Sequence, residues 1–190
     1  PTKYGQSLKA IATDTGFLEW ESFDESNTTW FKGRFDVKSL KTIDTTDKSV
    51  SKTLLELLTE AKSQNSQFLE NTSGLKVETK LTFPRTWGLG TSSTLINNIA
   101  QWAAVDAYQL LWNAFGGSGY DIACAQHNRP ILYQKENSTA HVEEVTFQPS
   151  FANSIYFVYL NQKQNSKDAI TTYRKQQFDT DSLITDVSTI

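Results

Sequence analysis

The sequence predicts an α+β fold in which an antiparallel meander of strands is covered by helices. Three observations predict it. The first third alternates apolar and polar residues, as in FLEWESF at 17–23. Apolar residues then recur with helical spacing over 50–61. After Gly90 the pattern becomes apolar around most of a helix circumference. With 190 residues, of which 38% are apolar, the chain is long enough to bury a core.

Composition excludes several classes of function. Lysine and arginine total 18 and aspartate and glutamate total 21, which gives 18 − 21 = −3, so no overall basic field exists for nucleic acid or an anionic membrane. One cysteine and two histidines exclude an internal disulfide and a zinc site of usual spacing. No apolar run approaches the roughly 20 residues of a membrane helix. We therefore expect a cytoplasmic protein that binds neither nucleic acid nor membrane.

The first half is predicted to form four strands and one helix. The strands are Tyr4–Ala12, Phe17–Phe23 and Thr29–Phe35, in that order in the meander, followed later by Leu75–Phe83, which runs into Pro84. Between them, the amphipathic pattern predicts a helix over Val50–Ala61 that lies on the sheet, with Ser49 or Ser51 as its cap.

The second half is predicted to begin with helices and to continue with strands. A buried helix over 95–104 is followed by Asp106 as the N-cap of a second helix, Ala107–Phe115, which stops at two glycines. The remaining predicted elements are a short helix Asp121–Gln126, strands Pro130–Gln134, Val142–Phe147 and Ile155–Leu160, and a helical stretch from Ser166 past Tyr173. The stretch Gln148–Asn153 is the best candidate for a domain junction.

The segment Pro84-Arg-Thr-Trp-Gly-Leu-Gly-Thr-Ser-Ser-Thr94 lies between a predicted strand and a predicted helix. Two glycines two residues apart permit positive φ, so that successive backbone amides can point into one concavity beside the helix N-terminus. Three adjacent hydroxyls, on Thr91, Ser92 and Ser93, add donors and an oxygen for Mg²⁺. These features describe a phosphate-binding loop, although neither the Walker A loop nor the full dinucleotide fingerprint is present. The alternative is a plain strand-to-helix turn with glycines for packing and hydroxyls as caps.

The same segment resembles the second signature of the GHMP kinases, the superfamily of galactokinase, homoserine kinase, mevalonate kinase and phosphomevalonate kinase, in its residues Pro84 and Gly88-Leu-Gly-Thr-Ser-Ser93. A second anchor, Gly116-Gly-Ser-Gly-Tyr-Asp121, resembles the turn that presents the catalytic aspartate in the mevalonate-kinase branch. A third, Leu160-Asn-Gln-Lys-Gln-Asn-Ser166, is similar to the opening of the C-terminal domain. The resemblance covers roughly residues 75 to 173.

The resemblance implies a set of site residues. ATP phosphates would be bound by Gly88, Leu89, Gly90, Thr91, Ser92 and Ser93, with Ser92 also holding Mg²⁺. Asp121 would be catalytic, and Ser118, Gly119 and Ser166 would bind the acceptor. For Asp121 the alternative is a plain N-cap of the short helix, and for Ser166 a plain N-cap is an equally good interpretation.

The resemblance also implies the architecture and the reaction. The two-domain fold would place an N-terminal phosphate-binding α/β domain at 1–149 and the start of a ferredoxin-like C-terminal domain at 150–190. The family's first signature, with its lysine and glutamate, and its third, a glycine-rich loop, have no counterpart here, so we expect a chain truncated at both ends and inactive alone. The expected function is ATP- and Mg²⁺-dependent phosphorylation of a small mevalonate-like acceptor, with a homodimer as a possible assembly. The alternatives are a non-catalytic nucleotide-binding module and an ATP-dependent decarboxylase of the mevalonate-diphosphate type.

Overall fold

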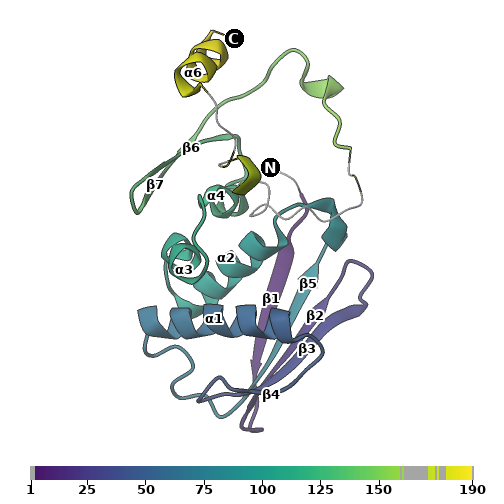
Figure 1. The fold of residues 1–190 in the computed structure, drawn as a ribbon. Helices are drawn as coiled ribbons and strands as arrows, with labels where there is room; N and C mark the ends of the chain where they lie inside the picture. Colours follow the sequence, from purple (N-terminus) through teal and green to yellow (C-terminus); the bar gives the residue numbers. More distant parts are fainter. Residues whose placement is uncertain (1–2, 159, 161–170, 174, 176–178, 190) are drawn as a thin grey trace.

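The computed structural model describes residues 3–158, 160, 171–173, 175 and 179–189, and it is a mixed α+β structure (Figure 1). A five-stranded sheet consists of β1 (Gln6–Ala12), β2 (Phe17–Phe23), β3 (Thr29–Asp36), β4 (Thr42–Thr45) and β5 (Leu75–Leu81). Its order is β1-β5-β2-β3-β4. The α+β class expected from the sequence is confirmed at this level.

The predicted meander is wrong at its first connection, because β5 lies between β1 and β2. It pairs antiparallel with β1, where Val77 faces Ala10, and parallel with β2, where Val77 faces Trp20. The reason is burial: alternate residues of β5, from Leu75 to Leu81, are all buried, whereas β1 is mostly exposed. A strand with one fully buried face belongs in the middle of a sheet, and β1 is left at the edge.

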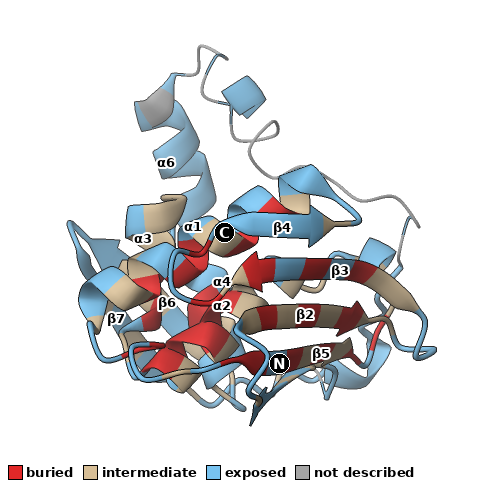
Figure 2. Cartoon of the chain, turned by 90° about the horizontal axis from the view of Figure 1, so that it is seen from below, coloured by how far each residue is buried: buried red, intermediate tan, exposed pale blue. Residues whose placement is uncertain are grey.

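Two helices, α1 (Lys48–Gln64) and α2 (Thr91–Ala103), lie on one face of this sheet, and α3 (Ala107–Ala114) packs against both of them. Figure 2 shows the buried residues gathered between the sheet and these helices. Asp106 caps α3 as predicted, by accepting a hydrogen bond from the Gln109 amide. The predicted cap of α1 is wrong: Asp47 accepts from the amides of Ser49 and Val50, and the helix begins two residues earlier than expected.

A small polar network is buried in the core beside α2. The Ser22 hydroxyl oxygen accepts hydrogen bonds from Trp20 Nε1 at 3.1 Å and from the Thr79 hydroxyl at 2.8 Å. All three side chains are at most 2% exposed. Because buried polar groups are costly without partners, this network fixes the register of β2 against β5.

The second half adds a short helix, a hairpin and a final helix: α4 (Tyr120–Gln126), β6 (Ile131–Glu136), β7 (Thr139–Glu144) and α6 (Thr180–Ser188), with 3₁₀ turns η1 (Arg85–Trp87) and η2 (Ala152–Ser154). The hairpin matches two predicted strands to within a few residues. Residues 171–173 are helical, as expected, while Ser166 lies outside the described residues.

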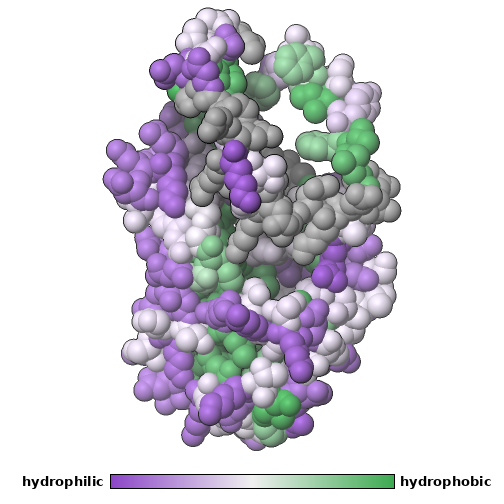
Figure 3. Space-filling view, in the orientation of Figure 1, coloured by the Kyte–Doolittle hydropathy of each residue, from purple (hydrophilic) through white to green (hydrophobic). Residues whose placement is uncertain are grey.

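The predicted strand Ile155–Leu160 does not form over its described residues. A strand requires a neighbour for its backbone groups, and among the described residues none pairs with this stretch. Its large apolar side chains remain exposed, from 51% at Ile155 to 87% at Phe157. Together with Phe147 and Phe151 they form an apolar arc above the sheet-and-helix body (Figure 3).

Within the part of the chain that the structure describes, no helix combines the length and the apolar character needed to cross a membrane.

Candidate functional site

The predicted phosphate loop connects η1 to α2, at the end of β5. Gly88 has φ 72° and ψ 22°, and Gly90 has φ 72° and ψ 42°, so both adopt the left-handed conformation that favours glycine. Gly90 is the N-cap of α2, and no side chain caps the helix. The first-turn amides of α2 are therefore not satisfied by a capping side chain.

The loop glycines are not required for packing. A Cβ added at Gly88 would meet no atom within 4 Å, and one at Gly90 would meet only Ser93 Cβ at 4.0 Å. The loop therefore has open space beside both glycines, and their shared feature is the positive φ. The alternative interpretation of the segment was a plain turn with glycines for packing and hydroxyls as caps. The open space beside both glycines contradicts the part about packing.

The hydroxyls that follow the glycines differ in their hydrogen bonding. Ser92 is exposed, and Thr91 and Ser93 are half-buried. None of these three makes a hydrogen bond to another described side chain, and none caps α2. Thr94, in contrast, is fully engaged: its hydroxyl lies 2.9 Å from Gln6 Oε1 and 3.0 Å from the Thr91 carbonyl oxygen. The first turn of α2 is thus fixed to β1, while the predicted phosphate-binding hydroxyls stay accessible.

Aromatic contacts hold η1, the turn that precedes the loop. The guanidinium carbon of Arg85 lies 3.8 Å from the centroid of the Trp30 ring, a cation–π contact with β3. Trp87 packs edge-on against Tyr4 with ring centroids 5.6 Å apart. Trp87 therefore serves as a packing residue that holds η1 against the N-terminal segment.

The second glycine-rich turn, residues 116–119, is held by the β6 hairpin. Gly116, Gly117 and Gly119 have φ of 72°, 106° and 89°. Lys135 Nζ donates to the Gly117 carbonyl oxygen at 3.0 Å, and the Tyr133 hydroxyl donates to the Ser118 carbonyl oxygen. The sequence-based reasoning missed both donors. The predicted strand Pro130–Gln134 contains Tyr133 but ends one residue before Lys135, and a period of two places both on one face.

Gly119 is a site where no side chain fits. A Cβ there would lie 2.7 Å from the Tyr133 hydroxyl oxygen, 3.1 Å from Tyr108 Cδ1 and 3.4 Å from Trp112 Cζ2. The residue is buried between α3 and β6. Its glycine is therefore required both for the positive φ and for the space, unlike Gly88.

Asp121 lies in the first turn of α4 and is exposed. The alternative interpretation of this residue as an N-cap is wrong, because Gly119 is the N-cap and its carbonyl oxygen accepts from the amides of Ile122 and Ala123. The Asp121 carboxylate therefore does not cap α4, and it lies in the first turn of that helix, where the helix dipole favours a negative charge.

The two glycine-rich turns belong to neighbouring helices. α4 packs against α2, and Gln126 Nε2 donates to Asn97 Oδ1 at 3.0 Å. Among the described residues, Asp121 makes no hydrogen bond with the loop 88–93. Both turns thus precede helices that pack against each other, and no hydrogen bond between described residues joins their predicted functional groups.

Three tyrosines near the second turn have raised pKa values. Burial raises the pKa of Tyr133 and is the largest cause for Tyr108, while a hydrogen bond with Cys124 is the largest cause for Tyr120. A phenol is protonated at neutral pH even at its ordinary pKa, and the raised pKa of Tyr133 is in keeping with its role as a hydrogen-bond donor. Trp112 packs against Tyr108 and beneath the ammonium of Lys135, 4.5 Å from the ring centroid. Trp112 therefore serves as packing for the turn.

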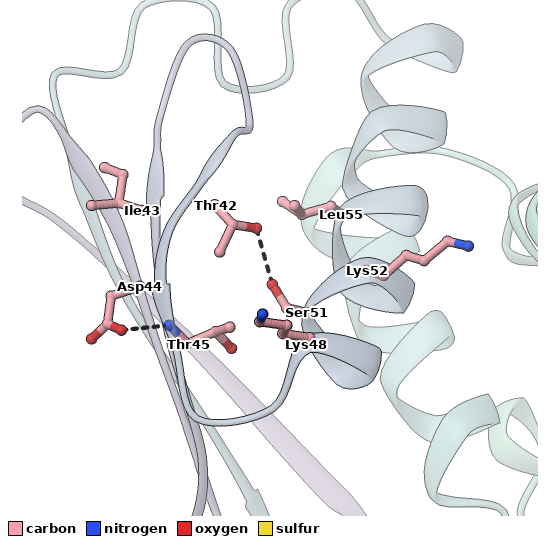
Figure 4. A pocket seen from close by; sticks show the side chains of 8 residues that line it. All are labelled: Thr42, Ile43, Asp44, Thr45, Lys48, Ser51, Lys52 and Leu55. Carbon is pink, nitrogen blue, oxygen red and sulfur yellow. Dashed lines mark hydrogen bonds between the residues drawn. The ribbon is translucent and has the colours of Figure 1, made fainter.

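A separate hollow of about 510 Å³ opens between β4 and the N-terminal half of α1 (Figure 4). It is lined by Thr42, Ile43, Asp44, Thr45, Lys48, Ser51, Lys52 and Leu55. The hydroxyls of Thr42 and Ser51 lie 3.2 Å apart across it. It contains none of the predicted site residues, so the predicted phosphate loop lies outside this hollow.

Magnesium would find few protein ligands at the loop. Among the described residues no group of three or more histidine, cysteine, aspartate or glutamate side chains could hold a metal ion. Mg²⁺ usually keeps several waters and binds through one or two protein oxygens together with substrate phosphates. The exposed Ser92 hydroxyl fits that mode of binding, in which the nucleotide supplies most of the ligands.

Comparison of the chain with protein-family models, with curated proteins and with solved structures gave no match.

Proposed function

We propose that this chain carries the phosphate-binding loop and the catalytic aspartate of an ATP- and Mg²⁺-dependent kinase of the GHMP type. Its substrate would be a small molecule with a hydroxyl and a carboxylate or phosphate group. The observation that carries the proposal is the pair of loop glycines. Both have positive φ, both have open space beside them, and they stand directly before the uncapped N-terminus of the 13-residue helix α2.

This geometry supports phosphate binding for an electrostatic reason. The unpaired first-turn amides and the dipole of α2 favour an anion at the Gly90 end of the helix. Backbone amides of residues with αL conformation add donors to the same concavity. The hydroxyls of Thr91, Ser92 and Ser93 are not consumed by capping, which leaves them for phosphate oxygens and for Mg²⁺.

The proposed role of Asp121 is that of a general base. Its carboxylate would accept the proton of the acceptor hydroxyl while that oxygen bonds to the γ-phosphorus and the bond from phosphorus to the β–γ bridging oxygen breaks, which releases ADP. Asp121 is exposed and does not cap α4, so its carboxylate is not committed to a structural task. The loop would bind and orient the phosphates, which is where most of the rate in phosphoryl transfer originates.

The experiment is a turnover assay with γ-labelled ATP, Mg²⁺ and a panel of hydroxy acids and sugar alcohols, on the chain and on longer forms of the protein. Asp121→Asn is expected to abolish transfer and to leave ATP binding intact. Asp14→Asn, at another exposed aspartate, is the matched control and should keep full activity. Near-normal turnover of Asp121→Asn would refute the assignment.

A nucleotide-binding module without catalysis is the second candidate. It is favoured by the lack of any hydrogen bond between Asp121 and the loop among the described residues. ATP binding without transfer to any acceptor, in every form of the protein, would support it. An ATP-dependent decarboxylase uses the same kinds of residue and would be distinguished by release of CO₂ from a labelled carboxylate.

A further inference from the structure

Two side chains of the β6 hairpin hold the turn that carries the proposed catalytic aspartate. The Tyr133 hydroxyl donates to the carbonyl oxygen of Ser118, and Lys135 Nζ donates at 3.0 Å to the carbonyl oxygen of Gly117. The two donors are thus one strand period apart and bind two consecutive peptide groups of the turn. We infer that Tyr133 and Lys135 are positioning residues that set the orientation of the Asp121 turn; this inference rests on the function proposed above.

Side chains from α3 and from the β6 hairpin restrict the conformation of the turn. Gly119 is enclosed by Tyr133 on one side and by Tyr108 and Trp112 of α3 on another. The Tyr133 ring also meets the Tyr120 ring edge-on, with centroids 6.0 Å apart. A turn with three glycines at positive φ is otherwise conformationally free, so side chains from outside must fix it.

The direction of the two bound carbonyls determines what the turn presents. In a trans peptide the C=O and the following N–H point in opposite directions. Since the Gly117 and Ser118 carbonyls face the hairpin, the amides of Ser118 and Gly119 point away from it. Those amides make no hydrogen bond to another described residue. The hairpin therefore directs the amide of the exposed residue Ser118 away from β6, where it can meet an anionic group of the acceptor, while the amide of Gly119 belongs to a buried residue.

The fixed turn also determines where α4 begins. The Gly119 carbonyl oxygen accepts from the amides of Ile122 and Ala123, at 3.0 and 3.1 Å, and Asp121 lies between these residues and the turn. A displacement of the turn therefore moves the carboxylate of Asp121. A displacement of about 1 Å at a reacting group can lower a rate about 100-fold.

The experiment compares Tyr133→Phe and Lys135→Met with the wild-type chain. Each removes one donor and keeps most of the side-chain volume, and Lys135→Arg restores a donor. Tyr156→Phe, which makes the same chemical change at a side chain that is 82% exposed, is the matched control. Amide hydrogen exchange is measured for Ile122 and Ala123 in the chain, and kcat and the KM for MgATP are measured with the acceptor panel on the same variants of the longer, active form of the protein.

We expect amide exchange at Ile122 and Ala123 to accelerate about tenfold in Tyr133→Phe and Lys135→Met, with the melting temperature lowered by no more than about 2–4 °C. In the turnover assay kcat should fall about 10- to 100-fold while the KM for MgATP is retained, because the phosphate loop is elsewhere. Lys135→Arg should restore both readouts and Tyr156→Phe should change neither.

Unchanged exchange at Ile122 and Ala123 in both variants would overturn the inference whatever the turnover assay shows. Faster exchange with unchanged kcat would overturn it as well, since the hairpin would then support the fold only. If neither the wild-type chain nor any longer form of the protein phosphorylates an acceptor, the proposed function fails, while the exchange measurement still decides whether the hairpin orients the turn.

Discussion

Replacing Gly119 by alanine tests the second glycine-rich turn most severely. The residue has φ of 89°, and a Cβ would lie 2.7 Å from the Tyr133 hydroxyl oxygen. That oxygen cannot move away without weakening its hydrogen bond to Ser118. Gly16 offers a control: it has φ of 77° and no atom within 4 Å of an added Cβ. The two substitutions share the backbone strain and differ in the crowding.

The expected magnitudes follow from these two terms. An alanine with left-handed φ costs about 1–2 kcal/mol, which is the whole effect at Gly16. At Gly119 overpacking adds about 1–3 kcal/mol, and loss of the Tyr133 hydrogen bond adds about 1 kcal/mol. We therefore expect Gly119→Ala to lower the free energy of unfolding by about 3–6 kcal/mol, and by roughly 2–4 kcal/mol more than Gly16→Ala.

Urea denaturation followed by tryptophan fluorescence measures both values, since the chain contains five tryptophans. The reasoning would be refuted if the two variants lost the same stability within about 0.5 kcal/mol, because the crowding at Gly119 would then carry no energy. A double variant, Gly119→Ala with Tyr133→Phe, should recover part of the loss, because the nearest atom of the clash is removed.

Three further outcomes are expected. Ser22→Ala should lower the free energy of unfolding by about 2–4 kcal/mol, because it leaves the Trp20 and Thr79 donors unpaired, whereas Thr79→Val should cost about 1 kcal/mol; equal losses would contradict the network. Hydrogen bonds from Val50 first, and then from Ser49, lower the pKa of Asp47 below its ordinary 3.8, so the stability that it contributes is present above pH 4 and is lost as pH falls through the lowered pKa. Asp47→Asn keeps the cap and should flatten the acid limb of a pH–stability curve, and an unchanged limb would contradict this. Phe157→Ser should change the melting temperature by less than about 2 °C, because its side chain is 87% exposed, and should reduce binding of an apolar dye; a large destabilisation would show that the side chain is buried.

Local patterns predicted local structure well. The apolar spacing after Gly90 identified α2, and Ile96, Ile99 and Ala100 are buried as expected. Asp106 was predicted as a cap because the cap signal lies within four residues of the helix that it starts. The segment 84–94 was placed between a strand and a helix, with two glycines that permit positive φ, and both glycines adopt a positive φ.

Long-range pairing was not predictable in the same way. The position of β5 between β1 and β2 depends on which strand buries its whole face, and alternation alone does not report that difference. For the same reason the apolar run at 155–160 was predicted as a strand, although no described strand lies beside it. The contacts of Tyr133 and Lys135 with the glycine turn join residues 15 and 18 positions apart, and the sequence contains no signal for such contacts.

The central claim, that the loop 88–93 binds the phosphates of ATP, is tested most directly by calorimetric titration with MgATP. Gly88→Ala and Gly16→Ala carry nearly the same strain, with φ of 72° and 77° and no atom within 4 Å of an added Cβ. We predict that the wild-type chain binds MgATP, that Gly88→Ala weakens binding at least about tenfold by placing a methyl group in the phosphate space, and that Gly16→Ala leaves the affinity within about twofold. No binding by the wild-type chain, or the same affinity in both variants, would contradict the account.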